Sequence, residues 1–149
     1  MLDNFNLYFP NMRVSRFQIK AGDTIPLHCH PNQYGFIYVL AGKCLIKNFE
    51  TLNQNQENYQ LKLINEVVVR TNDYLTITPT YNAHIIVAQE ETVFLELFAP
   101  GVKSGFLSQH LEIKENLRDN ILVAKTIDIK SAKLPDYILH PAGNNLEVK

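Results

Sequence analysis

Three histidines have the residue type and the spacing to hold one metal ion. His28 and His30 flank Cys29 in the run Leu-His-Cys-His. In an extended strand, side chains two residues apart project from the same face, so both imidazoles can reach one ion. His84 lies much later in the chain, but antiparallel strands bring such distant residues side by side inside a barrel. Imidazole binds zinc, copper, iron and nickel, so the ligand type alone leaves the ion open.

The same residues also allow a less specific interpretation, which the spacing leaves open. Two histidines separated by one residue occur by chance, and a lone histidine such as His84 is usually a hydrogen-bonded, half-buried side chain. The remaining histidines, His110 and His140, lie outside the strongest strand pattern. We predict that these two are surface or hydrogen-bonded side chains.

The elements that must position the histidines are predicted to be strands. From Arg13 onward, short runs rich in Val, Ile, Thr, Phe and Tyr are separated by Gly, Pro, Asn and Asp, which is typical of successive antiparallel strands. The pattern predicts an all-β fold, and the number of runs suits a jelly-roll barrel. We expect strands at 13–20, 24–30, 35–40, 43–50, 61–70, 74–78, 84–89 and 92–98.

Two further segments carry weaker signals. Residues 51–60 are rich in Asn, Gln and Glu without apolar alternation, which predicts a hydrated hairpin loop. Beyond Pro100, residues 106–117 favour a short helix and 121–129 another strand, whereas the tail from Lys133 gives no clear prediction. We expect one domain over residues 1–149, with its core at about 13–100 and with 101–149 packing on or extending the barrel.

Charge and composition exclude several classes of protein. The chain has 14 basic and 15 acidic side chains and a net charge of -1, so it has no strong field to attract nucleic acid or anionic membranes. We expect neither as a partner. It has no signal-peptide pattern and no long apolar run, so we predict a cytoplasmic protein, monomeric or homodimeric. Cys29 and Cys44 form no disulfide framework and no CxxC pair, and are predicted to be reduced thiols.

The region from Phe17 to Pro100 resembles the cupin superfamily. The first cupin motif is matched by GDTIPLHCHPNQYGFIYVLAG, which contains Gly22, His28, His30 and Gly42. The second motif is matched more loosely by DYLTITPTYNAH, in which Asp73 and Tyr81 replace the usual glycines and Pro79 and His84 are retained. This resemblance implies a cupin-type jelly-roll β-barrel with His28, His30 and His84 as metal ligands.

One departure from the cupin pattern affects the expected chemistry. Gly35 occupies the position at which many cupins have a glutamate as a fourth ligand. Gln33 and Tyr34 are poor replacements. Three neutral imidazoles leave the ion with its full charge and with open positions, which favours an anionic substrate ligand.

Within the cupins, the sequence most resembles the three-histidine thiol dioxygenases of the cysteamine dioxygenase and plant cysteine oxidase family. The segments that carry this resemblance are His28-Cys29-His30-Pro31, Val39-Leu40-Ala41-Gly42, Asn82-Ala83-His84 and Phe94-Leu95-Glu96-Leu97-Phe98-Ala99-Pro100. It implies a non-haem Fe(II) enzyme that oxidises a small thiol (cysteamine, cysteine or an N-terminal cysteine) to a sulfinic acid with O2. The later part of the family's pattern, after Pro100, has no clear counterpart here.

Several residues besides the histidines are candidates for the site. The resemblance places Glu96 in the active site, and its strand parity with Phe94 and Phe98 implies a desolvated carboxyl of raised pKa if that face is inward. Tyr81, beside His84, is a candidate to hydrogen-bond dioxygen or substrate, or simply to cover the barrel end. Arg16 and Arg70 are candidates to bind a substrate carboxylate.

Other functions remain compatible with this pattern. One is a three-histidine cupin dioxygenase acting on a carbon substrate. Another is a non-catalytic ligand-binding or sensor cupin, or a sugar isomerase. Zn(2+), Ni(2+) and Mn(2+) are alternatives to Fe(2+), since three histidines and a water also form catalytic zinc sites.

Overall fold

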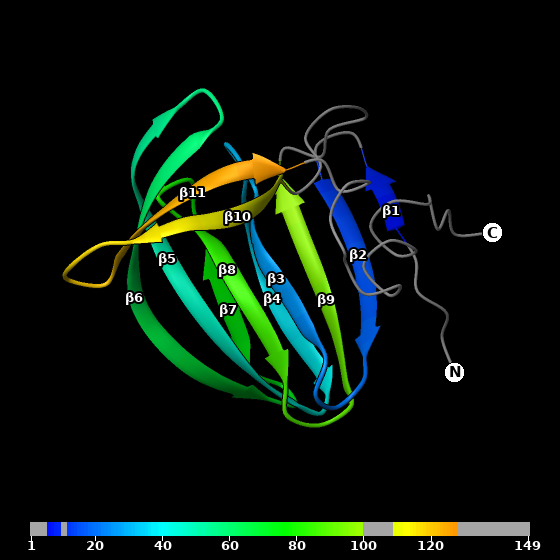
Figure 1. Ribbon diagram of the computed structural model, residues 1–149. Coiled ribbons are helices and arrows are strands. Elements are labelled where there is room, and N and C mark those ends of the chain that lie inside the picture. Colours follow the sequence, from blue (N-terminus) through cyan, green and yellow to red (C-terminus); the bar gives the residue numbers. More distant parts are fainter. Residues whose placement is uncertain (1–5, 10–11, 100–108, 128–149) are drawn as a thin grey trace.

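The computed structural model describes residues 6–9, 12–99 and 109–127, and these parts of the chain contain strands and no helix (Figure 1). The strands are β1 (Asn6–Phe9), β2 (Met12–Ile19), β3 (Thr24–Cys29), β4 (Tyr34–Ala41), β5 (Lys43–Asn55), β6 (Asn58–Arg70), β7 (Tyr74–Ile77), β8 (Tyr81–Ala88), β9 (Thr92–Ala99), β10 (Gln109–Asn116) and β11 (Ile121–Ile127). No helix in the described parts is long and apolar enough to cross a membrane.

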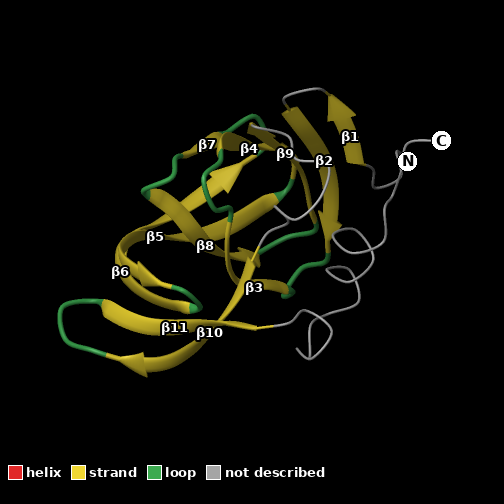
Figure 2. Cartoon of the chain, turned by 90° about the horizontal axis from the view of Figure 1, so that it is seen from above, coloured by secondary structure: helices red, strands yellow, loops and turns green. Residues whose placement is uncertain are grey.

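The strands form two antiparallel sheets. The first has the order β1-β2-β9-β4-β7, and the second, β10-β11-β6-β5-β8-β3, closes into a barrel because β3 pairs with β10. Figure 2 shows β2, β9, β4 and β7 along one side, β6, β10 and β11 on the other, and β3, β5 and β8 between them. The central strands therefore present one face to each side.

Each face of the central strands packs against its own hydrophobic core. One core joins both sheets and includes Ile37 and Phe98 of the first and Ile86 of the second. The other core includes Leu27 and Leu61 and draws only on strands of the closed barrel. Because side chains alternate along a strand, successive residues of a central strand face one core and then the other.

The predicted strands of residues 13–98 are confirmed, and the structure adds β1. The predicted hairpin at 51–60 is confirmed, with exposed side chains at 52–58, but its loop is shorter than expected: β5 and β6 continue to a turn at Gln56, which has a φ of 53°. Backbone pairing overrides the polar composition there, because Tyr59 pairs with both Gln54 and Ala124 and is itself buried.

The strand predicted after residue 120 is confirmed, and the short helix predicted at 106–117 is wrong. Residues 121–127 form β11 as expected, but residues 109–116 form strand β10 where we predicted part of a helix. Pairing in register with β11 and β3 supplies the backbone hydrogen bonds of this segment. The tail from Lys133 lies outside the described residues.

Candidate metal centre

His28, His30 and His84 converge between the two sheets. His28 on β3 pairs in register with His84 on β8, and His30 follows directly after β3. The ring centroids are 4.3 Å apart for His28 and His84, 5.1 Å for His28 and His30, and 5.2 Å for His30 and His84. All three side chains are at most 3% exposed. The structure therefore brings together the three histidines selected from the sequence.

A β-bulge sets the direction of the His28 side chain. Register between β3 and β8 shifts between Ile25 and His28. Ile25 lies in the core between the sheets. Without that shift, regular alternation would place Leu27 in the same core and would point His28 into the closed barrel. Leu27 instead lies in the core of the closed barrel. The extra residue reverses the parity, so that Leu27 and Cys29 point into the closed barrel and His28 points toward the ligand cluster.

The imidazoles are electrically suited to a cation. Burial, together with the neighbouring histidines, lowers the pKa of His28 and His30 well below the ordinary value, and burial lowers that of His84 to about 3. All three are therefore neutral near pH 7, the form that binds a metal. His28 Nδ1 lies 2.8 Å from the Pro26 carbonyl oxygen and donates to it, which leaves Nε2 for an ion. His84 Nε2 is buried with no hydrogen-bond partner, as expected of a nitrogen reserved for a ligand.

Glu96 completes the cluster from the facing sheet. It lies on β9, is 4% exposed, and offers a carboxylate oxygen within 4.8 Å of the ligand atoms of all three histidines. Burial raises the pKa of Glu96 to about 7, although the charge of Arg13 opposes that rise. Four donor atoms thus lie close together, and three imidazoles with a carboxylate suit a divalent ion of the first transition row.

Asn82 holds His30 in place. Its side-chain oxygen accepts a hydrogen bond from the backbone N–H of His30, and its amide nitrogen donates to the carbonyl oxygens of His30 and Thr78. His30 lies beyond the end of β3, so this clamp replaces ladder bonds that the strand no longer provides. The His30 ring also stacks on Phe98, with centroids 4.0 Å apart. The sequence placed Asn82 beside the third ligand but gave no sign of its role at His30.

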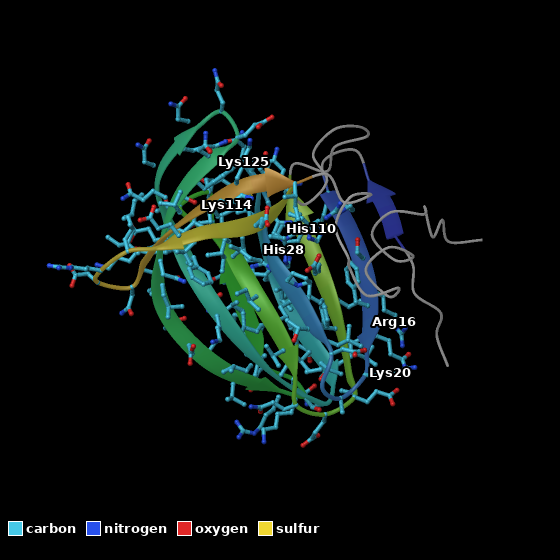
Figure 3. All side chains as sticks on the ribbon, in the orientation of Figure 1. Arg16, Lys20, His28, His110, Lys114 and Lys125 are labelled. Carbon is cyan, nitrogen blue, oxygen red and sulfur yellow. The ribbon has the colours of Figure 1, made fainter. Side chains whose placement is uncertain are left out.

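His110 contradicts its prediction as a surface or hydrogen-bonded histidine. It is 4% exposed, and its Nδ1 is buried without a hydrogen-bond partner in the described structure. It pairs in register with His28, with ring centroids 5.7 Å apart, and Figure 3 shows the two side by side. The error follows from the helix prediction, although alternation of Leu111 and Ile113 with polar residues signals a strand there. His140 lies outside the described residues.

The other candidates are less central. Tyr81 is 51% exposed at the start of β8 and is not among the rings that contact the three histidines in the described structure. Arg70 is exposed at the end of β6. Arg16 is buried, but its side chain points to the opposite side of β2 from that of Ser15, which pairs with Glu96. Arg16 therefore faces away from the cluster. The arginine on the side of the cluster is Arg13, which was not among the candidates predicted from the sequence.

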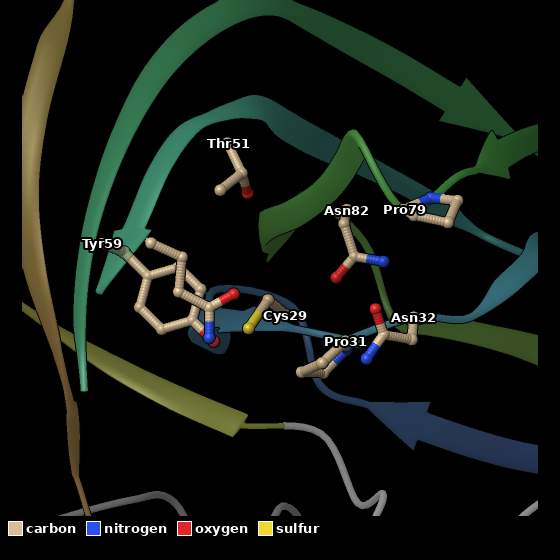
Figure 4. A pocket seen from close by; sticks show the side chains of 8 residues that line it. Cys29, Pro31, Asn32, Thr51, Tyr59, Pro79 and Asn82 are labelled. Atoms are coloured by element: carbon tan, nitrogen blue, oxygen red, sulfur yellow. The ribbon is translucent and has the colours of Figure 1, made fainter. Parts of the chain in front are cut away.

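Neither cysteine is a candidate nucleophile. Burial raises the pKa of Cys29 to about 11 and that of Cys44 to about 12, so both are protonated thiols at neutral pH. Cys29 lines a small polar cavity of about 50 Å³ with Tyr59 and Asn82 (Figure 4). This cavity lies on the face of β3 opposite to the histidine cluster.

The fold and its inward-facing histidines define a cupin, an all-β jelly-roll barrel. Residues 7–108 match the PCO_ADO family, that of the plant cysteine oxidases and cysteamine dioxygenase. The match spans more than half of the chain, and the protein belongs to this family. Both resemblances seen in the sequence are thereby confirmed.

Solved structures show the same fold at low sequence identity. BH2720 from Bacillus halodurans has a TM-score of 0.52 at 18% identity, covering 72% of this chain and 76% of its own. KdgF from Halomonas sp. has a TM-score of 0.52 at 17% identity, covering 67% and 79%. A search of curated protein sequences found no significant match.

Proposed function

We propose that the protein is a thiol dioxygenase that uses Fe(II) and O2 to convert a small thiol into a sulfinic acid. The observation that carries the proposal is the convergence of His28, His30 and His84 in a member of the PCO_ADO family. The reaction balances without a further reductant: both atoms of O2 are added to RSH to give RSO2H, sulfur loses four electrons, and dioxygen gains four. A reducing compartment such as the cytoplasm would keep the substrate as a thiol.

The chain's own residues hold and shield the site. His28, His30 and His84 would bind the ion, and bound Fe(II) would supply the one-electron chemistry by which dioxygen and a thiolate react. The contact of His28 with the Pro26 carbonyl fixes the ring tautomer. Phe98 and Ile37, each 1% exposed, keep water from the inner side of the cluster.

We further propose that Glu96 is a fourth ligand. It approaches the histidines from β9, whereas β4 has Gly35 and supplies no carboxylate there. The family pattern has the shorter aspartate at this position, and the added methylene extends the reach of the carboxylate toward the ion. A carboxylate ligand removes one unit of the ion's charge, so the site would take one anionic thiolate as a net neutral unit.

Glu96→Gln is expected to weaken metal binding while stabilising the metal-free protein. The dissociation constant should rise by at least about tenfold, since an amide oxygen is a poorer ligand than a carboxylate. At pH 8 the buried carboxylate of the folded wild type is ionised, and unfolding hydrates it. Because the folded pKa of Glu96 is raised to about 7, ionisation destabilises the fold as pH rises above the ordinary carboxyl range, by roughly 3 kcal/mol once the pH exceeds 7.

Calorimetric metal titration and urea unfolding at pH 5 and pH 8 test both effects. Glu96→Asp is the matched control, because it keeps the buried charge but shortens its reach. It should lose metal affinity without the gain in stability at pH 8. Wild-type metal affinity in Glu96→Gln would exclude Glu96 as a ligand.

Oxygen uptake tests the function itself. Protein purified without oxygen and loaded with Fe(II) should consume O2 with at least one of cysteamine, cysteine, 3-mercaptopropionate or a peptide with an N-terminal cysteine. One sulfinic acid should form per O2 consumed, as measured by mass spectrometry. Protein with full iron occupancy and no uptake with any thiol would refute the proposal and favour a carbon substrate or a non-catalytic cupin.

A further inference from the structure

Arg13 lies in the wall of the candidate metal centre. It is 7% exposed, and along β2 it shares its parity with Ser15, the register partner of Glu96. Its guanidinium carbon is 5.8 Å from the centroid of the Phe98 ring, and that ring stacks on His30. One aromatic ring therefore links this cation to a histidine of the cluster.

The charge of Arg13 acts on the cluster. Burial is the largest cause of the pKa shifts of Glu96 and His30, but Arg13 lowers the pKa of both by its positive charge. The register agrees with this, because Arg13 pairs with Phe98 and so lies on the face of the sheet that carries Phe98 and Glu96. Arg13 therefore lies on the same side of the sheet as the candidate metal centre.

Within the described residues, this buried cation has no ion-pair partner. The ion pairs found there involve three lysines with glutamates on the surface, and Nε of Arg13 is buried with no hydrogen-bond partner. Glu96 is the carboxylate nearest in register, but its oxygen belongs to the group of four metal donors. Burying a guanidinium costs several kcal/mol unless an anion meets it. Within the described structure, Arg13 is thus a buried cation beside the candidate metal centre with no carboxylate of its own.

We propose that Arg13 binds a carboxylate of the substrate, so that the substrate is a thiol that also carries a free carboxylate, such as cysteine or 3-mercaptopropionate. This inference rests on the proposed function. The planar guanidinium matches a carboxylate in a two-pronged hydrogen-bonded pair. A thiolate on the ion and a carboxylate on Arg13 would hold a short molecule at both ends. Cysteamine has no carboxylate, and an N-terminal cysteine has an amide in its place, so both would bind less well.

Equilibrium binding without oxygen separates this role from simple charge balance with Glu96. The Co(II)-loaded protein is titrated anaerobically with thiols, and the thiolate-to-metal absorption band reports binding. Cysteine and cysteine methyl ester form a matched pair that differs in the carboxylate charge, and 3-mercaptopropionate and cysteamine form a second pair. We expect the wild type to bind each carboxylate-bearing thiol at least about tenfold more tightly than its partner, as charged hydrogen bonds allow.

Arg13→Gln should remove this preference. Its affinity for cysteine should fall by about tenfold or more, while its affinity for the methyl ester stays within about twofold. Arg13→Lys, which keeps the charge but not the fork, should retain part of the preference and serves if Arg13→Gln does not fold. Arg70→Gln, at an exposed arginine on β6, should bind both thiols as the wild type does.

Other outcomes overturn the proposal. Equal affinities of the wild type for both members of each pair would do so, as would an equal loss for both thiols in Arg13→Gln, which would indicate charge balance alone. Absence of saturable binding by any of the four thiols would also reject it. Tight, Arg13-dependent binding of cysteine without oxygen uptake by the Fe(II) protein would instead refute the dioxygenase and retain the carboxylate site.

Discussion

Replacing His84 with alanine is expected to reduce bound metal from about one ion per chain to nearly none, and to abolish thiol-dependent oxygen uptake. His84 offers a buried Nε2 with no other partner, and its ring lies closest to that of His28. Loss of one of three imidazoles leaves too few neutral donors to hold a divalent ion against buffer and chelator. His28→Ala should have the same effect, because His28 is the other member of the cross-strand pair.

Metal analysis after dialysis against a weak chelator measures this loss, and circular dichroism at 25 °C checks that the variants fold. His110→Asn is the matched control. It also removes a buried histidine next to His28, but His110 is not in the group whose ligand atoms lie within 4.8 Å of one another. It should keep its metal. Full occupancy in either alanine variant would refute the three-histidine site.

Local sequence pattern was sufficient for the parts of the site that strand geometry decides. The spacing of His28 and His30 predicts that both side chains point the same way, and both reach the cluster, although His30 lies just beyond the end of β3 and is held there by Asn82. Glu96 follows the same rule through Phe94 and Phe98, both of which are buried with it. Each of these predictions uses the two-residue period of a strand and the residue type two positions away.

The remaining parts depend on pairing between distant strands. His110 lies beside His28 because β10 pairs with β3, and the sequence around His110 does not identify β3 as the partner strand. Arg13 faces the cluster through the register of β2 with β9, and a shift of one residue would have selected Val14 instead. The bulge before His28 is likewise a property of the pairing. Register is set by the packing of whole sheets, so it cannot be derived from one segment.

The position of Gly35 explains why the carboxylate must come from another strand. Gly35 pairs in register with Phe98, and a Cβ built on it would collide with the Leu97 carbonyl oxygen and lie 2.7 Å from Phe98 Cδ1. Phe98 is 1% exposed and is held between His30 and the core. Neither the ring nor the backbone of β9 can move away without disturbing the cluster. A glutamate at position 35 is therefore excluded by packing as well as absent from the sequence.

Gly35→Ala is accordingly expected to destabilise the protein by more than about 3 kcal/mol, which is large for a single methyl group. Gly22→Ala is the matched control: Gly22 has a φ of +87° but no atom within 4 Å of its added Cβ. It should cost only about 1 kcal/mol, from backbone strain. Urea unfolding of the metal-free variants separates the two costs, since neither residue offers a ligand atom.

The stability of Gly35→Ala relative to Gly22→Ala also tests whether packing is the reason that β4 supplies no carboxylate to the three histidines. If Gly35→Ala unfolds far more easily than Gly22→Ala, the close packing of β4 against β9 prevents a carboxylate from β4, and Glu96 of β9 is the carboxylate that lies beside the three histidines. If Gly35→Ala is as stable as Gly22→Ala, β9 yields to a side chain at position 35. Gly35→Glu would then be expected to bind metal more tightly than the wild type, and Glu96 would lose its claim to be the required carboxylate.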